Sequence, residues 1–174
     1  MDRRSVIKNF LVVSAGVALM PSCIQGSKQS SVKLDYLTIS SDQEELLAGL
    51  AETILPKTTS LGAGDLSAHL FALTMVDDCF GKEDRERFQQ GLKAFEEETG
   101  KRFSKPFTRL SAEEKTALLK DLEAGKDVPE DAVAFYHTMK GLTVQCFVTS
   151  EYFMTTVSKY EMAPARYHGC VPVA

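Results

Sequence analysis

Residues 130–158, EDAVAFYHTMKGLTVQCFVTSEYFMTTVS, form the most apolar stretch of the sequence. Gly141 and the cluster Thr149-Ser150-Glu151 predict one long helix followed by a shorter one, with Thr149 or Ser150 as the cap of the second. His137 falls among aromatic residues. We expect it to be a hydrogen-bonded histidine of the core or the surface, because ligating histidines are much rarer in such a setting.

Two further helices are predicted before this stretch. Ser111-Ala112-Glu113-Glu114 is a capping box, with serine at the N-cap and glutamate at N3, and the helix that it opens ends before Gly125. The segment from Lys82 to Thr99 is amphipathic, and Gly100 is expected to end it. The apolar faces of these helices carry Leu118, Leu119 and Leu122, and Phe88, Leu92 and Phe95.

The first two helices of the domain follow the same logic. One is capped by Ser41 or Asp42 and stopped by Pro56. The other runs from Leu66 to Phe80 with Asp65 as its N-cap, and because it is apolar on most sides it is expected to be central. Near its end we expect Asp77 and Asp78 to be solvated or ion-paired, since adjacent helical residues point about 100° apart and are poorly placed to share a proton or a cation.

These patterns predict an all-α fold, a single compact domain of five to six helices over residues 41–174 with an irregular C-terminal tail. Without residues 1–22 the chain has a charge of about −6 and shows no clustered basic face, which argues against nucleic-acid binding. The Gly62-x-Gly64 loop follows a helix and lacks the final glycine of a dinucleotide fingerprint. A zinc site would need long-range convergence of cysteines and histidines, and no local ligand pair exists.

Residues 1–22 are expected to be a signal peptide. Arg3-Arg4-Ser5-Val6-Ile7-Lys8 precedes an apolar run from Phe10 to Met20, which is too short to span a bilayer. The paired arginines resemble the twin-arginine export signal of bacteria; an ordinary secretory signal is the alternative. Ser22-Cys23 resembles the lipidation site of a bacterial lipoprotein, so residues 23–40 are expected to be a lipidated tether of a periplasmic, membrane-anchored protein. The alternative is a soluble periplasmic protein.

Five blocks in order resemble the gluconate 2-dehydrogenase subunit 3 family, over residues 37–174 and in the leader as well. They are Leu50-Ala51-Glu52-Thr53-Ile54-Leu55-Pro56-Lys57-Thr58, Asp77-Asp78-Cys79, Phe107-Thr108-Arg109-Leu110-Ser111, Thr149-Ser150-Glu151 and Tyr167-His168-Gly169-Cys170-Val171-Pro172. The resemblance implies a small helical subunit that accompanies a large flavin-dependent sugar or polyol dehydrogenase, often with a cytochrome c, and carries it through the twin-arginine export machinery. FAD would then lie in the large subunit, with no cofactor and no catalytic residue in this chain.

Two classes of function therefore stay open. In the first, the chain is a non-catalytic accessory subunit that binds, stabilises and helps to export the dehydrogenase. In the second, it is an independent enzyme, or a periplasmic lipoprotein that binds a small solute or a partner protein, with a site assembled from residues such as Asp77, Tyr136 and His137.

The cysteines other than Cys23 permit one disulfide and one unpaired thiol. We expect a Cys79–Cys170 bond, because it would fix the Pro- and Gly-containing tail across the helices and because both residues belong to the blocks of the resemblance. Cys146, within the apolar stretch, is expected to be reduced and buried. The alternative is a Cys146–Cys170 bond, if the tail folds back on the last helices.

Overall fold

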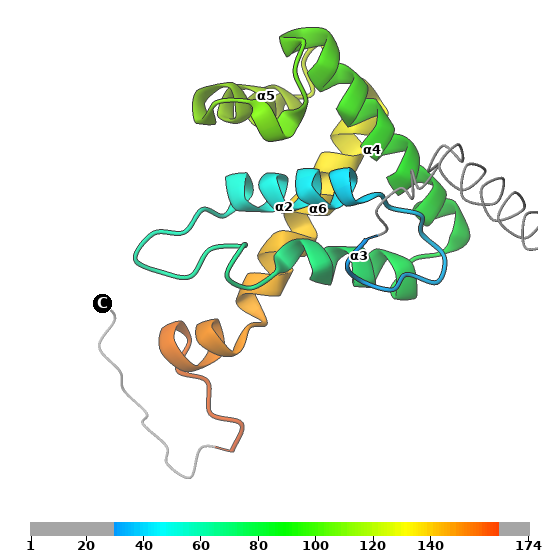
Figure 1. Cartoon of the computed structure of the whole chain (residues 1–174). Coiled ribbons are helices and arrows are strands. Elements are labelled where there is room, and N and C mark those ends of the chain that lie inside the picture. The colour runs from blue at the N-terminus through cyan, green and yellow to red at the C-terminus, as the bar shows by residue number, and fades with distance from the viewer. Residues whose placement is uncertain (1–29, 164–174) are drawn as a thin grey trace, which may run out of the picture.

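The computed structural model describes residues 30–163, which form helices and loops without a β-strand and confirm the all-α prediction (Figure 1). None of the helices in this part of the chain is both long and apolar enough to cross a membrane. The elements are α2 (Ser41–Ile54), α3 (Ala68–Cys79), α4 (Lys82–Phe103), the 3-10 turn η1 (Phe107–Arg109), α5 (Ala112–Ala124), α6 (Glu130–Val148) and the π-helical turn η2 (Phe153–Val157).

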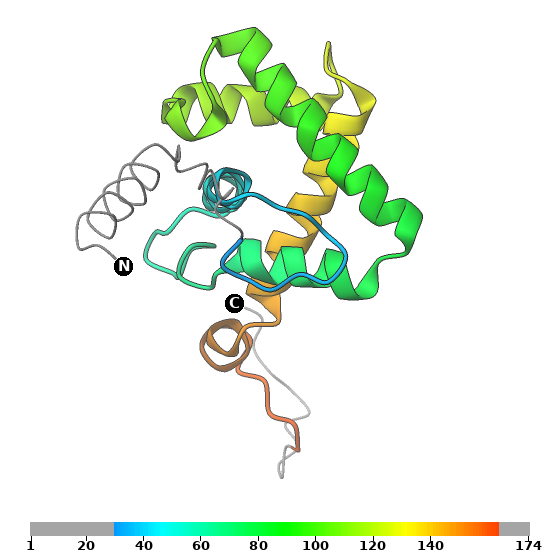
Figure 2. The same cartoon turned by 45° about the vertical axis from the view of Figure 1, so that its right-hand side comes forward.

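Helix α6 is the element around which the other helices pack. It runs through the molecule from the neighbourhood of α5 to η2, with α3 and α4 crossing it (Figures 1 and 2). Phe135 of α6 lies between two rings of α4, with centroids 5.1 Å from Phe88 and 5.5 Å from Phe95. All three rings are buried, and burial of large apolar side chains stabilises the folded domain.

Both predicted boundaries of α5 are confirmed. Ser111 accepts from the Glu114 N–H and the Glu114 carboxylate accepts from the Ser111 N–H, which is the capping box that the sequence predicts. Gly125 ends α5 in the left-handed conformation with φ 61°. The predicted cap of α2, Ser41 or Asp42, is wrong. Both residues lie inside the helix, because Ser40 is the N-cap and forms a second capping box with Gln43.

Two further predicted helix boundaries are wrong. Gly100 lies inside α4, which continues to Phe103. Its last turn is held by Arg102, whose guanidinium pairs with Glu98 of the same helix and with Asp121 of α5, and donates to the carbonyl of Asp127. These contacts with residues far along the chain outweigh the local tendency of glycine to end a helix.

Asp65 is not an N-cap, and α3 begins later than expected, at Ala68. The Asp65 carboxylate instead accepts from the Gly62 N–H at 3.0 Å and from the Lys57 ammonium at 2.8 Å. A Cβ on Gly62 would lie 2.5 Å from the backbone nitrogen of Lys57. The two backbone segments can approach this closely because residue 62 has no side chain.

Candidate functional site

Exposed apolar side chains gather at one end of the molecule. Six large apolar residues are exposed in the described part of the chain, and five of them lie within residues 144–162: Val144, Val148, Val157, Tyr160 and Met162. We call residues 144–162 the apolar projection, because η2 and the residues after it extend away from the helical body (Figures 1 and 2). Apolar side chains gathered on one surface are typical of a binding site for another protein.

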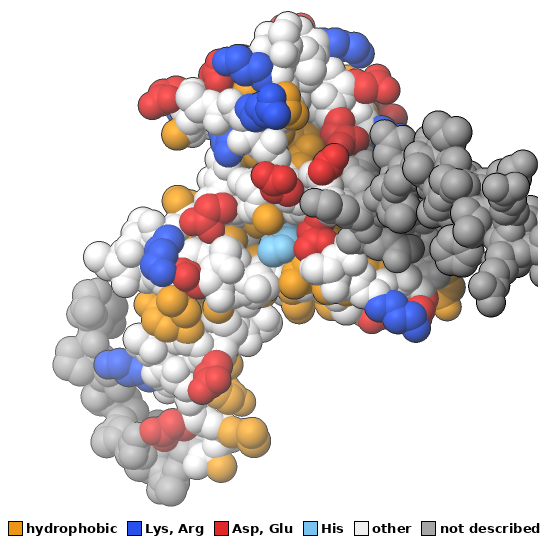
Figure 3. Space-filling view, in the orientation of Figure 1, with side chains coloured by type: hydrophobic (Ala, Val, Ile, Leu, Met, Phe, Trp, Pro, Cys, Tyr) orange, Lys and Arg blue, Asp and Glu red, His pale blue; other side chains and the backbone are white. Residues whose placement is uncertain are grey.

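The apolar projection keeps its shape through local contacts. The Ser150 hydroxyl accepts from the Phe153 N–H at 3.2 Å and donates to the Phe147 carbonyl at 2.6 Å, which turns the chain after α6. The Phe147 ring lies 5.5 Å from that of Phe153 and 6.3 Å from that of Tyr152. No residue from 149 to 163 is buried, so this segment presents its rings and methyl groups to the surroundings. Figure 3 shows orange side chains on this lower part of the surface.

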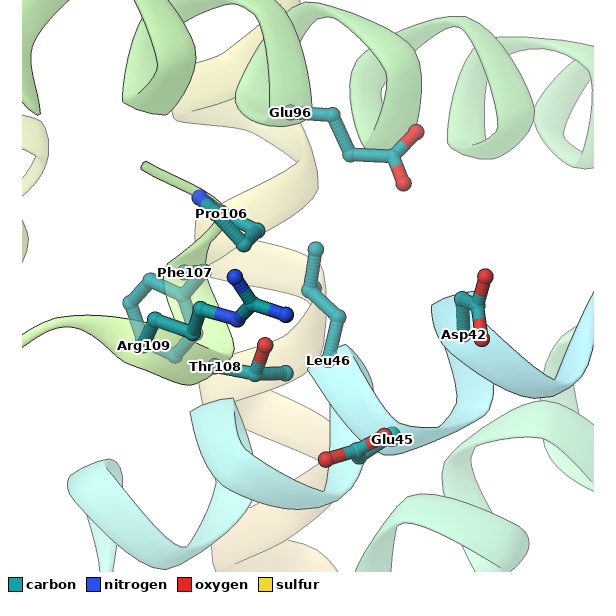
Figure 4. Close-up of a pocket in the computed structure, with 8 residues that line it drawn as sticks. All are labelled: Asp42, Glu45, Leu46, Glu96, Pro106, Phe107, Thr108 and Arg109. Carbon is teal, nitrogen blue, oxygen red and sulfur yellow. The ribbon is translucent and has the colours of Figure 1, made fainter. Parts of the chain in front are cut away.

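A second feature is a pocket of about 430 Å³ between α2, α4 and η1 (Figure 4). Its floor is apolar, because Leu46 and Phe107 are buried there in the core. Its rim is charged. The lining residues are Asp42, Glu45, Leu46, Glu96, Pro106, Phe107, Thr108 and Arg109.

The charges of this pocket are mostly unpaired. Within residues 30–163, Asp42, Glu45 and Arg109 form no ion pair, and Glu96 accepts one hydrogen bond, from the Gln43 amide at 3.3 Å. The Arg109 guanidinium points into the pocket from η1, while the carboxylates come from α2 and α4 (Figure 4). Three carboxylates facing one guanidinium leave the rim with a net negative charge of two, which favours a cationic ligand.

Asp77 is the most important correction to the expected helix end. It is buried, with 2% of its surface exposed, and its carboxylate accepts three backbone N–H groups, from Asp35 at 2.7 Å, Tyr36 at 2.9 Å and Leu37 at 2.7 Å. Burial would raise the pKa of Asp77, but these hydrogen bonds and the charge of Arg85 hold that pKa below its ordinary value. Asp78 is exposed, as expected.

Residues 30–40 are therefore docked on the helices. Leu37 and Ile39 enter the core, and Arg85 stacks on the Tyr36 ring, 4.2 Å from its centroid, while donating to the carbonyls at the end of α3. At the start of the segment, Ser31 donates to the Glu44 carboxylate of α2 through its N–H at 2.6 Å and through its hydroxyl. The chain thus joins the domain beside the N-terminal half of α2.

The residues of the alternative enzymatic site lie in separate surroundings. Asp77 binds the backbone of residues 35–37, whereas Tyr136 is buried, and burial together with a hydrogen bond to Glu123 raises its pKa to about 12. His137 is exposed, with its ring 5.5 Å from that of Tyr136. In the described residues no group of three or more His, Cys, Asp or Glu side chains could hold a metal ion.

Of the other predicted site residues, Arg3, Arg4, Cys23 and Cys170 lie outside the described residues. Cys79 is exposed at the end of α3. Cys146 is buried, as expected, with its sulfur 3.9 Å from the Leu66 carbonyl, and burial raises the pKa of its thiol. The Cys79–Cys170 bond stays a prediction.

The pocket and the apolar projection were not predicted as sites. The one available signal for the pocket was the block Phe107-Thr108-Arg109, which carries the resemblance and forms the η1 wall. The carboxylates opposite it come from helices about 50 residues apart in the sequence, so no local pattern brings them together.

In comparisons with known proteins, the sequence model of the family described as Gluconate 2-dehydrogenase subunit 3 matches residues 41–164. The chain has no significant match among curated proteins or among solved structures.

Proposed function

Because the chain belongs to the gluconate 2-dehydrogenase subunit 3 family, we propose that it is a non-catalytic accessory subunit of a dehydrogenase complex. Its role is to bind, stabilise and assist the export of a large FAD-dependent sugar or polyol dehydrogenase. The observation that supports this role most directly is the apolar projection, which offers a binding surface without using the core of the domain.

The apolar projection has the composition of an interface centre. Tyr160 and Met162, 57% and 87% exposed, belong to residue types that are enriched where protein partners bury each other, and Val144 and Val148 add aliphatic area on the adjoining turn of α6. Burial of this surface against the large subunit stabilises the complex by roughly 25 cal/mol per Å² of apolar area, less the cost of ordering the segment.

The flavin belongs to the large subunit in this proposal, and a cytochrome c is a further partner in the complex. This chain supplies the export address and the anchor: Arg3 and Arg4 recruit the twin-arginine machinery, and lipid on Cys23 holds the complex at the membrane from the periplasmic side. A dehydrogenase that folds around its cofactor before export needs a route for folded proteins, and a small bound subunit with such a leader provides one.

The test is purification of the affinity-tagged full chain from the organism that carries its gene. We expect a flavoprotein dehydrogenase to co-purify, with flavin absorbance and sugar- or polyol-dependent dye reduction in the same fraction. Val148→Glu combined with Val157→Glu should remove the flavoprotein, because two charges would be buried unpaired at the interface. Thr116→Glu combined with Ala117→Glu, at exposed positions on α5, is the matched control and should retain it.

Two results would contradict the proposal. One is a wild-type chain that elutes alone under conditions in which the dehydrogenase is intact and active. The other is equal recovery of flavin with the variant on the apolar projection and with the α5 control, which would place the interface elsewhere.

A further inference from the structure

The charged pocket and the attachment of the N-terminal segment share one helix, α2. Ser31 is bound by Glu44, which is the immediate neighbour of the pocket residue Glu45 on α2. The N-terminal segment therefore joins the domain on the same helix, α2, that supplies Asp42 and Glu45 to the pocket. Acidic side chains gather over α2 and α4 on this face of the molecule (Figure 3).

The lining of the pocket fits one class of ligand, a short basic peptide. The carboxylates of Asp42, Glu45 and Glu96 suit guanidinium or ammonium groups, which prefer paired charge-assisted hydrogen bonds. The apolar floor suits the methylene stems of arginine and lysine, and the Arg109 guanidinium can donate to backbone carbonyls of an extended chain. A simple anion would be repelled by the carboxylates, and a fully apolar ligand would leave these charges without partners.

We propose that this pocket binds the basic start of the chain's own leader, Arg3 to Lys8, and so masks the paired arginines before export. The inference rests on the export role proposed above. Residues 1–22 carry Arg3, Arg4 and Lys8 against one acid, Asp2, and the α-amino group of Met1 adds a positive charge, so the leader is opposite in sign to the rim. The 25 residues between Arg4 and Ser30 can span up to about 3.3 Å each, so the connection reaches the pocket easily.

The contact between the leader and the pocket is reversible, because it depends on exposed ion pairs. Ion pairs at an exposed rim are weak and are screened by salt, but attachment to the same chain gives the leader a high effective concentration at the pocket. The pocket needs α2, α4 and η1 in place, so masking occurs only in the folded domain. The export receptor then has to compete with the pocket for Arg3 and Arg4.

The test is limited trypsin cleavage of the purified full-length chain, including its leader, followed by intact mass. Cleavage after Arg3 or Arg4 reports how often the arginines are accessible. In low salt we expect the wild type to lose its first residues about fivefold more slowly than the variant Asp42→Asn, Glu45→Gln, Glu96→Gln, the factor that one or two exposed ion pairs provide. High salt should remove the difference.

The matched control is Asp78→Asn, Glu83→Gln, Glu97→Gln, which neutralises three exposed carboxylates outside the pocket and should cleave like the wild type. Helical circular dichroism of every variant verifies that the domain is folded. Equal cleavage of the wild type and the pocket variant overturns the proposal. If, in addition, the pocket variant loses binding to the purified dehydrogenase, the pocket serves the partner protein instead of the leader. No dehydrogenase is present in the cleavage assay, so its result is independent of the accessory-subunit proposal.

Discussion

The carboxylate of Asp77 gives residues 35–37 the hydrogen-bond partners that a neighbouring strand would otherwise supply. A non-helical segment that packs on a core must satisfy its backbone N–H groups, because an unpaired buried donor is costly. A buried carboxylate is also costly unless it accepts several hydrogen bonds. Each side of the contact thus removes the desolvation cost of the other, and the segment is fixed at a single position on the helices.

We expect Asp77→Asn to lower the free energy of unfolding by about 2–4 kcal/mol, since charge-assisted hydrogen bonds are lost and the amide NH₂ faces backbone donors. Asp78→Asn is the matched control, because the neighbouring carboxylate is exposed, and it should change stability by less than about 0.5 kcal/mol. Urea unfolding at neutral pH measures both. Equal midpoints for the two variants would show that the contact does not hold the segment.

The same carboxylate predicts a pH dependence. The pKa of Asp77 in the folded protein is lowered, so its contribution to stability is complete above the ordinary aspartate pKa of about 3.9 and is lost as the pH falls through the lower folded value. The stability difference between wild type and Asp77→Asn should therefore be constant from pH 7 to about pH 5 and shrink below pH 4. A difference that persists undiminished at pH 2 would contradict this linkage.

Asp77 also shows why single residues are difficult to interpret from sequence. The side chain sits beside Asp78 at a helix end, where solvated carboxylates are common, and its partners are backbone atoms about 40 residues earlier. Backbone N–H groups leave no trace in the identity of residues 35–37. The capping box at Ser111 could be predicted because both of its partners lie within four residues.

At the scale of the elements, α4 and α6 cross in close contact at Gly91. A Cβ at this position would lie 2.6 Å from the Asp131 carbonyl oxygen and 2.6 Å from the Phe135 Cβ. The two helices can therefore approach only because residue 91 has no side chain, and this approach brings Phe88 and Phe95 onto Phe135.

We expect Gly91→Ala to destabilise the domain by about 1–3 kcal/mol, because the backbone of α6 has to move away. Gly100→Ala in the same helix is the control: nothing lies within 4 Å of its Cβ, so the better helix propensity of alanine should stabilise the domain by about 0.5–1 kcal/mol. Thermal unfolding of both variants tests the pair. A stabilised Gly91→Ala protein would mean that α4 and α6 are not in close contact.

Helix existence could be predicted more reliably than helix ends. Amphipathic spacing, capping residues and apolar stretches are properties of the segment itself, so α2, α4, α5 and α6 were all expected. The end of α4 depends on Arg102 and its partners in another helix and loop, and the role of Asp65 depends on a loop that folds back on it. Such contacts between distant parts of the chain are not visible in local patterns.

At the scale of the whole molecule, the apolar stretch of residues 130–158 is divided between the core and the surface. Phe135 and Met139 are buried, whereas Val148 and Val157 are exposed on the apolar projection. The sequence shows the same kinds of residues in both halves. The distinction arises because α6 is longer than the bundle that covers it, which only the arrangement of all the helices determines (Figure 2).

The Cys79–Cys170 bond is a prediction at this scale as well. Cys79 is exposed at the end of α3 and so is accessible to the tail, and closing a loop of about 90 residues contributes up to about 4–5 kcal/mol in the chain-entropy account. A non-reducing peptide map of the exported protein should show these two cysteines joined, and a reductant should lower the melting temperature of the wild type but not of Cys79→Ser. A map with Cys146 in the bond would contradict the pairing.

The hold of Asp77 on residues 35–37 has a practical consequence for engineering. The carboxylate accepts hydrogen bonds from backbone N–H groups, so the side chains at positions 35 and 36 can be exchanged without loss of these bonds. Proline is the exception, because it has no backbone N–H. The helical body therefore binds the backbone of this segment independently of the side chains at positions 35 and 36. Leaders, tags or anchors of foreign origin can be joined upstream of Ser30, so that the contacts of Ser31 with Glu44 and of residues 35–37 with Asp77 are kept.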